Sequence, residues 1–166
     1  QSLKVNQKHF DPNYRRMGWV LFHLATTYKA LGKDQEAQEI YNKVLKIYAN
    51  YCHEDSIEVA NILRNMAKIY LDLNCFKEAE DLTQKSLKIL EPRQHVDAYR
   101  SYEILGEIYL KKFSQIRNIK KEKEIKFLRI KAMNYFNQAL QRINPHFSQN
   151  SAHIERLKSK IKSLQK

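Results

Sequence analysis

The sequence predicts an all-α protein in which antiparallel pairs of helices repeat along the chain and stack into a solenoid. Three observations predict this fold class. The 166 residues include only three glycines and three prolines, and this scarcity favours long helices over a turn-rich sheet. Apolar residues recur at helical spacing. The pattern also repeats with a period of 42 residues, within the range that is typical of solenoids.

The repeat appears when the chain is aligned with itself at a shift of 42 residues. Three copies of one short phrase then coincide, namely SLKV at 2–5, VLKI at 44–47 and SLKI at 86–89. Small and aromatic residues coincide as well: Ala25 with Ala67, Tyr28 with Tyr70, and Ala37 with Ala79. A third copy follows at altered shifts, in which Gly106, Tyr109, Ala132, Phe136 and Ala139 correspond to Ala67, Tyr70, Ala79, Thr83 and Ser86.

Each copy predicts two helices joined by a short turn. In the second copy, apolar residues between 63 and 71 follow the i, i+3, i+4, i+7, i+8 pattern of an amphipathic helix. A second helix starts at Phe76 and is stopped by Pro92. Because antiparallel helices approach most closely at small side chains, we expect the repeated alanines and Gly106 to mark helix–helix contacts rather than chemistry.

These patterns divide the chain into five segments. They are residues 1–10, the end of a preceding repeat helix; 11–52, the first unit; 53–92, the second; 93–145, the third; and 146–166, a capping helix. The first segment indicates a piece of a longer protein, and an irregular N-terminal cap is the alternative. The last segment predicts a helix with a polar outer face, because lysines separate Ile154, Leu157, Ile161 and Leu164.

The third unit contains a basic insertion at residues 111–131, with nine basic and two acidic residues. Its apolar residues recur at roughly helical spacing, so it either lengthens both helices of the unit or forms a projecting arm. We assign Phe127 and the nearby Tyr135 to the core. The insertion adds to an uneven distribution of the net charge of +12: residues 1–92 hold 13 basic and 12 acidic residues, whereas residues 93–166 hold 17 and 6.

No arrangement of residues indicates catalysis, so we expect no enzyme, no cofactor and no metal. The six histidines are scattered, and neither an HExxH nor a CxxC motif is present. His53 lies beside Cys52 and Glu54, and we interpret this run as a loop before a helix N-cap at Asp55 or Ser56. The two cysteines fit a reduced cytoplasmic protein, and no apolar run is long enough to span a bilayer.

The repeated residues resemble the tetratricopeptide repeat, whose pattern is W-x2-L-G-x2-Y, then A-x3-F, then P. The 42-residue period, with LKI before a loop and VANILRNMAKIY after it, looks like the longer variety found in kinesin light chains. The resemblance implies a right-handed superhelical solenoid of about three units plus a C-terminal capping helix. It also implies a non-enzymatic scaffold that binds a peptide or a protein subunit.

The resemblance further implies that the first helix of each unit lines a concave groove. Asn65 matches the groove asparagine that bonds a peptide backbone in many relatives, and an amide suits that role because it both donates and accepts. Trp19 is either a ligand anchor or a packing residue against a preceding repeat. The candidate groove residues are Trp19, Phe22, Asn61, Arg64, Asn65, Lys68 and Arg100.

One subgroup of the family is not matched. Its members hold the terminal carboxylate of chaperone tails with a lysine and an asparagine in the first unit and two cations in the third. Here Phe22 and Thr26 occupy the first two positions, and Ile104 occupies one of the last two. This departure argues against a role as a chaperone co-factor.

Two functions from different classes follow from the sequence. The first is the interaction scaffold, as part of a longer protein or a larger assembly such as a cytoskeletal or ciliary complex, which is an analogy only. The second is binding of an anionic partner: nucleic acid, acidic tails such as those of tubulin, or a membrane surface. The basic patch for that role is Lys120, Lys121, Lys123 and Lys126. A regulatory module joined to an enzyme in a longer chain is a third alternative.

Overall fold

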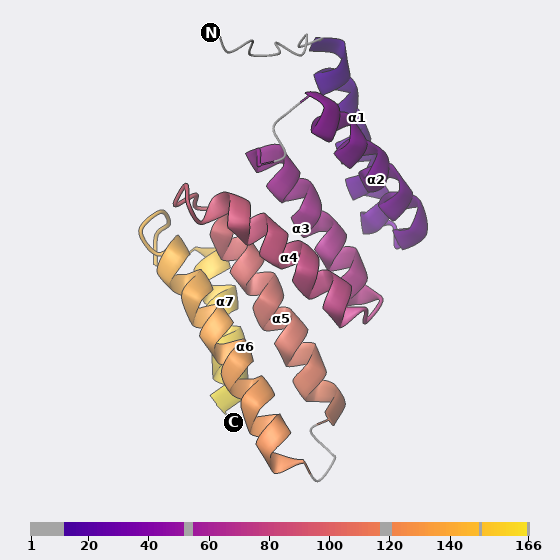
Figure 1. The fold of residues 1–166 in the computed structure, drawn as a ribbon. Helices are drawn as coiled ribbons and strands as arrows, with labels where there is room; N and C mark the ends of the chain where they lie inside the picture. Colours follow the sequence, from indigo (N-terminus) through magenta and orange to yellow (C-terminus); the bar gives the residue numbers. More distant parts are fainter. Residues whose placement is uncertain (1–11, 52–54, 117–120, 150, 166) are drawn as a thin grey trace, which may run out of the picture.

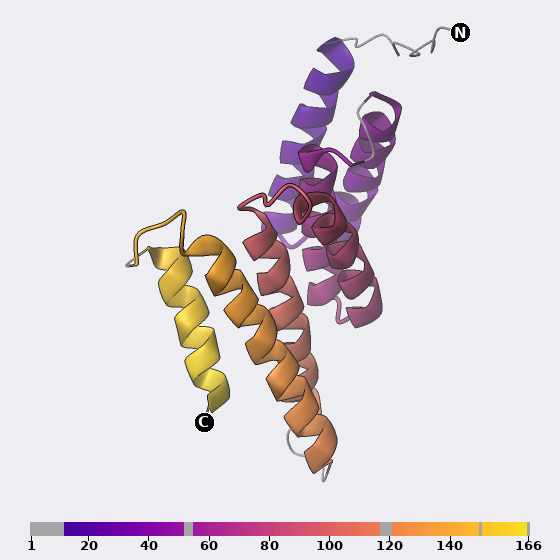
Figure 2. The same cartoon turned by 60° about the vertical axis from the view of Figure 1, so that its left-hand side comes forward.

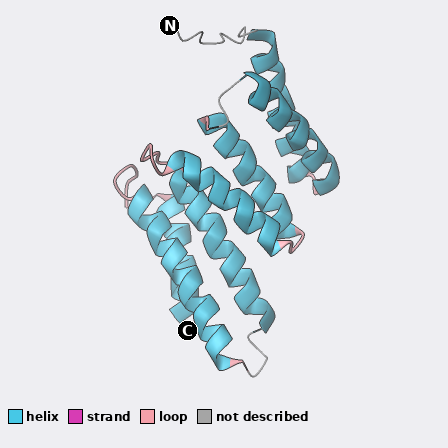
Figure 3. Cartoon of the chain, viewed as in Figure 1, coloured by secondary structure: helices cyan, strands magenta, loops and turns pink. Residues whose placement is uncertain are grey.

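The computed structural model describes residues 12–51, 55–116, 121–149 and 151–165, and these residues form seven α-helices and no strand (Figure 3). The all-α prediction is confirmed. The helices are α1 (Pro12–Ala30), α2 (Asp34–Tyr51), α3 (Ile57–Asp72), α4 (Phe76–Leu90), α5 (Ala98–Ile116), α6 (Glu122–Ile143) and α7 (Ala152–Gln165). The predicted helical end of a preceding repeat, at residues 1–10, lies outside the described residues.

The helices pack as three successive antiparallel pairs (Figure 1). The most extensive contacts join α1 to α2, α3 to α4, and α5 to α6. Smaller contacts join α2 to α3 and α4 to α5, so the second helix of each pair carries the next pair. The result is the solenoid of helix pairs that the repeat predicts.

The turns inside the first two pairs repeat as well. Gly32 and Asn74 are 42 residues apart, and both adopt a left-handed backbone with φ of 73° and 60°. Glycine and asparagine are the residues that tolerate this conformation best. Each turn is closed by an equivalent hydrogen bond, from the Lys33 amide to the Tyr28 carbonyl at 2.9 Å and from the Cys75 amide to the Tyr70 carbonyl at 2.8 Å.

The repeated small residues lie where the paired helices meet, as the sequence predicts. Ala25, Ala67 and Ala79 have no exposed surface. Gly106 takes the equivalent place in α5, and a Cβ atom there would lie 2.5 Å from Cε1 of Phe136 on α6. Since carbon atoms prefer a separation of about 3.5–4.0 Å, only glycine fits against this ring.

The basic insertion lengthens both helices of the third pair rather than forming a separate arm of the described chain. α5 and α6 have 19 and 22 residues, against 16 and 15 in α3 and α4. The assignment of Phe127 to the core is wrong, because its side chain is 54% exposed on the lengthened part of α6. Tyr135, about two helical turns further from the tip, is partly buried against the core as expected.

The predicted capping helix is α7, which packs on α6. Ile154, Leu157 and Leu164 are buried, and Ile161 is partly buried in the same cluster. Figures 1 and 2 show that α7 ends part of the way along α6, so it does not reach the tip of the lengthened pair. Phe127 is exposed because it lies nine residues before the buried Phe136, about 180° around α6 from that ring and so on the outer face of the helix.

Candidate partner-binding groove

The candidate groove lies along the first helices of the three pairs. α3 contacts both α1 and α5 directly, so these helices form one continuous face. The predicted groove residues come from all three helices: Trp19 and Phe22 from α1, a cluster from α3, and Arg100 from α5. Their environments differ along the face, and the difference decides which of them a ligand can reach.

At the α1 end, aromatic side chains form one wall of a hollow of about 200 Å³. The Trp19 side chain is 60% exposed, and its ring lies 4.3 Å from that of His23, centroid to centroid. Phe22 packs edge-on against Tyr41 of α2 at 5.8 Å, so it supports the wall. The other residues that line the hollow are His23, Glu58, Asn61 and Ile62.

In the middle of the face, Arg64 lies within the wall of the groove rather than on its surface. Its side chain is 6% exposed. The guanidinium donates to Oδ1 of Asn61 at 2.7 Å and to the carbonyl oxygen of Asp97 at 3.4 Å. Burial lowers the pKa of Arg64 to about 10, although Asp97 opposes this shift. Arg64 therefore ties α3 to the start of α5 and orients Asn61.

Asn65 lies one turn after Asn61 on α3. Its Nδ2 donates to the backbone carbonyl of Asn61 at 2.8 Å. This bond uses one donor hydrogen of the amide and leaves the side-chain oxygen without a partner among the described residues. Asn65 thus keeps an acceptor for a peptide N–H group, which is part of the role that the sequence predicts for it.

At the α5 end, an ion cluster joins α5 to α7. Arg156 donates to both carboxylate oxygens of Glu103 at 2.8 Å, and Lys160 donates to Glu103 at 2.9 Å and to Glu107. Burial would raise the pKa of Glu103, but the hydrogen bonds from Arg156 and Lys160 outweigh it and hold the pKa below its usual value. α7 therefore occupies this end of the face with its own cations.

Lys68 and Arg100 stand beside this cluster, on the wall of a hollow of about 410 Å³. Burial lowers the pKa of Lys68, and the carboxylates of Glu107 and Glu103 counteract it. Arg100 donates to the Tyr99 hydroxyl at 3.0 Å and lies 3.5 Å from an Asp97 oxygen. Of these two groove cations, Lys68 is therefore held less firmly by its neighbours than Arg100 is.

Sequence reasoning missed several residues of this face. Ile104, which the family resemblance places at a groove position of the third unit, is 1% exposed and belongs to the core. Arg156 and Lys160 of α7 were not among the candidates. Their spacing of four residues matches the spacing of Glu103 and Glu107, and this complementary i, i+4 pattern is the signal that could have identified them.

The basic patch is less basic in the structure than its lysines suggest. Lys121, Lys123 and Lys126 lie at the start of α6, and Lys120 lies outside the described residues. Lys121 pairs with Glu124 at 3.1 Å, and Glu122 stands between the first two lysines. The charge of Lys121 is therefore partly compensated within the part of the patch that the structure describes.

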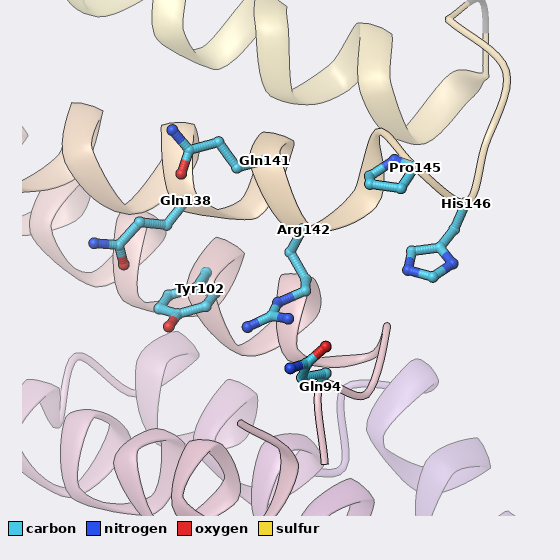
Figure 4. Close-up of a pocket in the computed structure, with 7 residues that line it drawn as sticks. All are labelled: Gln94, Tyr102, Gln138, Gln141, Arg142, Pro145 and His146. Atoms are coloured by element: carbon cyan, nitrogen blue, oxygen red, sulfur yellow. The ribbon is translucent and has the colours of Figure 1, made fainter. Parts of the chain in front are cut away.

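A third hollow, of about 450 Å³, lies between α5, α6 and the loop that precedes α5. Figure 4 shows Arg142 extending from α6 toward Tyr102 and Gln94. Arg142 is already paired with Glu91 at 2.7 Å, so its charge is compensated. We assign no ligand to this hollow.

The described residues contain no group of three or more histidine, cysteine or acidic side chains that could hold a metal ion. Among the same residues, no helix is both long enough and apolar enough to cross a membrane. The chemistry that the groove offers is therefore an aromatic surface, amide groups and a few cations.

Comparison with known proteins agrees with this architecture. The family model described as the tetratricopeptide repeat matches residues 16–91. Over these residues the chain is similar to the tetratricopeptide repeat family, and the chain as a whole has the fold of a tetratricopeptide-repeat solenoid. The resemblance that the sequence suggests is thus confirmed. No curated protein sequence matches the chain.

Solved structures show the same fold at low sequence identity. A putative kinesin light chain from Podosopora anserina with nearly identical TPR-like repeats has a TM-score of 0.65 at 15% identity, over 97% of this chain and 68% of that one. The N-terminal domain of stress-induced protein-1 from C. elegans has a TM-score of 0.59 at 14% identity, over 92% and 98%. BtubC from P. vanneervenii has a TM-score of 0.57 at 20% identity, over 92% and 66%.

Proposed function

We propose that the chain is a non-enzymatic interaction scaffold that binds an extended peptide segment of a partner protein in the groove between α1 and α3. One observation carries the proposal. The exposed indole of Trp19 stands over a hollow that Asn61 and Ile62 of α3 also line. An exposed aromatic side chain beside amides and an apolar floor is a typical anchor site for a partner.

The groove residues define the chemistry of the peptide. An apolar side chain of the peptide fits against Trp19, and its backbone N–H group fits the open oxygen of Asn65. Lys68, further along α3, favours an acidic side chain at that end of the peptide. Arg64 holds the wall in place from behind.

α7 limits the part of the groove that is open to a peptide. Because Arg156 and Lys160 already neutralise Glu103 and Glu107, the α5 end offers few open polar groups. The peptide site is therefore confined to α1 and α3. A reducing compartment such as the cytoplasm suits this scaffold, since Cys75 is a free thiol.

The test is a selection of peptides from a random library on the immobilised chain, followed by binding curves with a fluorescent peptide. Trp19→Ala and Asn65→Ala should weaken binding at least about tenfold, which corresponds to about 1.4 kcal/mol. Leu31→Ala is the matched control, because Leu31 is 67% exposed and lies in the turn after α1, outside the groove residues. Selected peptides that bind Trp19→Ala and Asn65→Ala as well as the parent would refute the groove.

A further inference from the structure

The first helix carries an apolar stripe that nothing in the described chain covers. Met17, Val20 and Leu24 are 44%, 54% and 43% exposed, and Thr27 continues the line as an exposed residue. Their spacing of three and four residues places all four on one face of α1. This face is distinct from the groove face, which Trp19 and Phe22 mark.

The internal repeat shows what this face does elsewhere in the molecule. The equivalent residues of α3, 42 positions later, are Val59, Ile62, Met66 and Ile69, and those of α5, a further 39 positions later, are Ala98, Ser101, Leu105 and Ile108. Every one of these eight side chains is at most 8% exposed. The same face is therefore buried in the second and third pairs and exposed in the first.

The covering element in those pairs is the second helix of the preceding pair. α2 contacts α3, and α4 contacts α5. In the later interface the hydroxyls of Ser86 on α4 and Ser101 on α5 lie 3.1 Å apart, and Ser101 is the equivalent of Val20. A helix docked on the stripe of α1 would thus continue an interface that the chain already uses twice.

A repeated hydrogen bond marks the same interface. Gln38 of α2 donates to the Tyr70 hydroxyl, and the Tyr109 hydroxyl donates to Glu80 of α4 at 2.8 Å. Gln38 and Glu80 are themselves 42 residues apart. Tyr28 is the equivalent tyrosine of α1, and its hydroxyl has no hydrogen-bond partner among the described residues.

We propose that the stripe Met17, Val20, Leu24 and Thr27, together with the Tyr28 hydroxyl, is a docking surface for one further helix of the second-helix type. The occupant packs on α1 as α2 packs on α3. It carries a small or aliphatic residue at the position of Val44 and Ser86. It carries a hydrogen-bonding side chain six residues earlier, at the position of Gln38 and Glu80.

The probe is a copy of α2 placed in the register that the repeat defines. In the chimera, a copy of residues 34–56 replaces residues 1–14, so that the copied helix precedes Arg15 as α2 precedes Ile57. Circular dichroism verifies that the copied helix forms. The melting temperature should rise by at least about 5 °C relative to the parent chain, because the copy covers the stripe.

Substitutions in both backgrounds show whether the gain comes from the stripe. Val20→Lys and Tyr28→Phe should change the melting temperature of the parent little and remove most of the gain of the chimera. Leu31→Lys is the matched control, because Leu31 and its repeat equivalent Leu73 are both exposed, at 67% and 47%. It should have the same small effect in both backgrounds.

A second chimera covers the case in which the first does not fold. In it, a copy of residues 76–97 replaces residues 1–16, so that the copied α4 precedes Met17 as α4 precedes Ala98. The proposal is overturned if neither chimera is more stable than the parent, or if Val20→Lys has equal effects in the two backgrounds. It is also overturned if sedimentation shows that the parent self-associates and that Val20→Lys makes it monomeric, because a second copy would then be the occupant.

Discussion

Replacing Gly106 with alanine tests how closely α5 and α6 approach. An ideal Cβ at Gly106 lies 2.5, 2.6 and 2.9 Å from three ring carbons of Phe136, whose side chain has no exposed surface. The ring has no empty space into which to move, so the helices must separate by roughly 1 Å to restore ordinary contact. Overpacking of this kind costs about 1–3 kcal/mol.

Helix propensity acts in the opposite direction. Alanine is favoured over glycine by about 1 kcal/mol in a helix interior. Because three atoms of a buried ring are in conflict, we expect the upper end of the cost and a net loss of about 2 kcal/mol. For a chain of this size the melting temperature should fall by about 4–8 °C. Urea denaturation followed by circular dichroism measures the free energy of unfolding.

Two variants separate the clash from other causes. The double variant Gly106→Ala, Phe136→Leu should be more stable than the sum of the two single effects predicts, by about 1 kcal/mol. Ala67→Gly, at the equivalent position of α3, should destabilise, because alanine is already accommodated there. A Gly106→Ala chain that is more stable than the parent by about 1 kcal/mol would refute the close approach.

Three further predictions concern charge and capping. Glu103 has a lowered pKa, so its contribution to stability is present above the unfolded-state pKa of about 4.3 and is lost as the pH falls through the folded-state value. Thermal melts should show that Glu103→Gln does not lose this stability at acid pH. Burial and the nearby Glu91 carboxylate raise the pKa of Tyr102 to about 12, so stability should fall as the pH rises from about 10 towards that value, and less so in Tyr102→Phe. Ser56→Ala should cost about 1 kcal/mol in urea denaturation, because the Ser56 hydroxyl accepts from the Val59 amide at the start of α3.

The helices could be predicted from the sequence because the signals that define them are local and are repeated. The apolar periodicity of α3 and the stop at Pro92 each involve neighbouring residues. Alignment at 42 residues then tests each assignment against a second copy. Gly32 and Asn74 illustrate this, because two different residues at one repeat position share the same left-handed turn.

The groove was harder to predict because its side chains depend on contacts between distant segments. A helix pattern places Arg64 on the inner face of α3, but it cannot show that the Asp97 carbonyl, 33 residues away, covers its guanidinium. The link between Glu103 and Arg156 spans 53 residues. The exposure of Phe127, by contrast, could have been predicted, because nine residues place it about 180° around α6 from the buried Phe136.

The groove and the docking stripe can be tested independently because they occupy different faces of α1. Adjacent residues of an α-helix point about 100° apart, so Trp19 and Val20 face different directions. Trp19→Ala should therefore weaken peptide binding and leave the stability gain of the chimeras unchanged. Val20→Lys should remove that gain and leave peptide binding unchanged. If either substitution impaired both properties, the two faces would form one surface, and a helix docked on α1 would compete with the peptide.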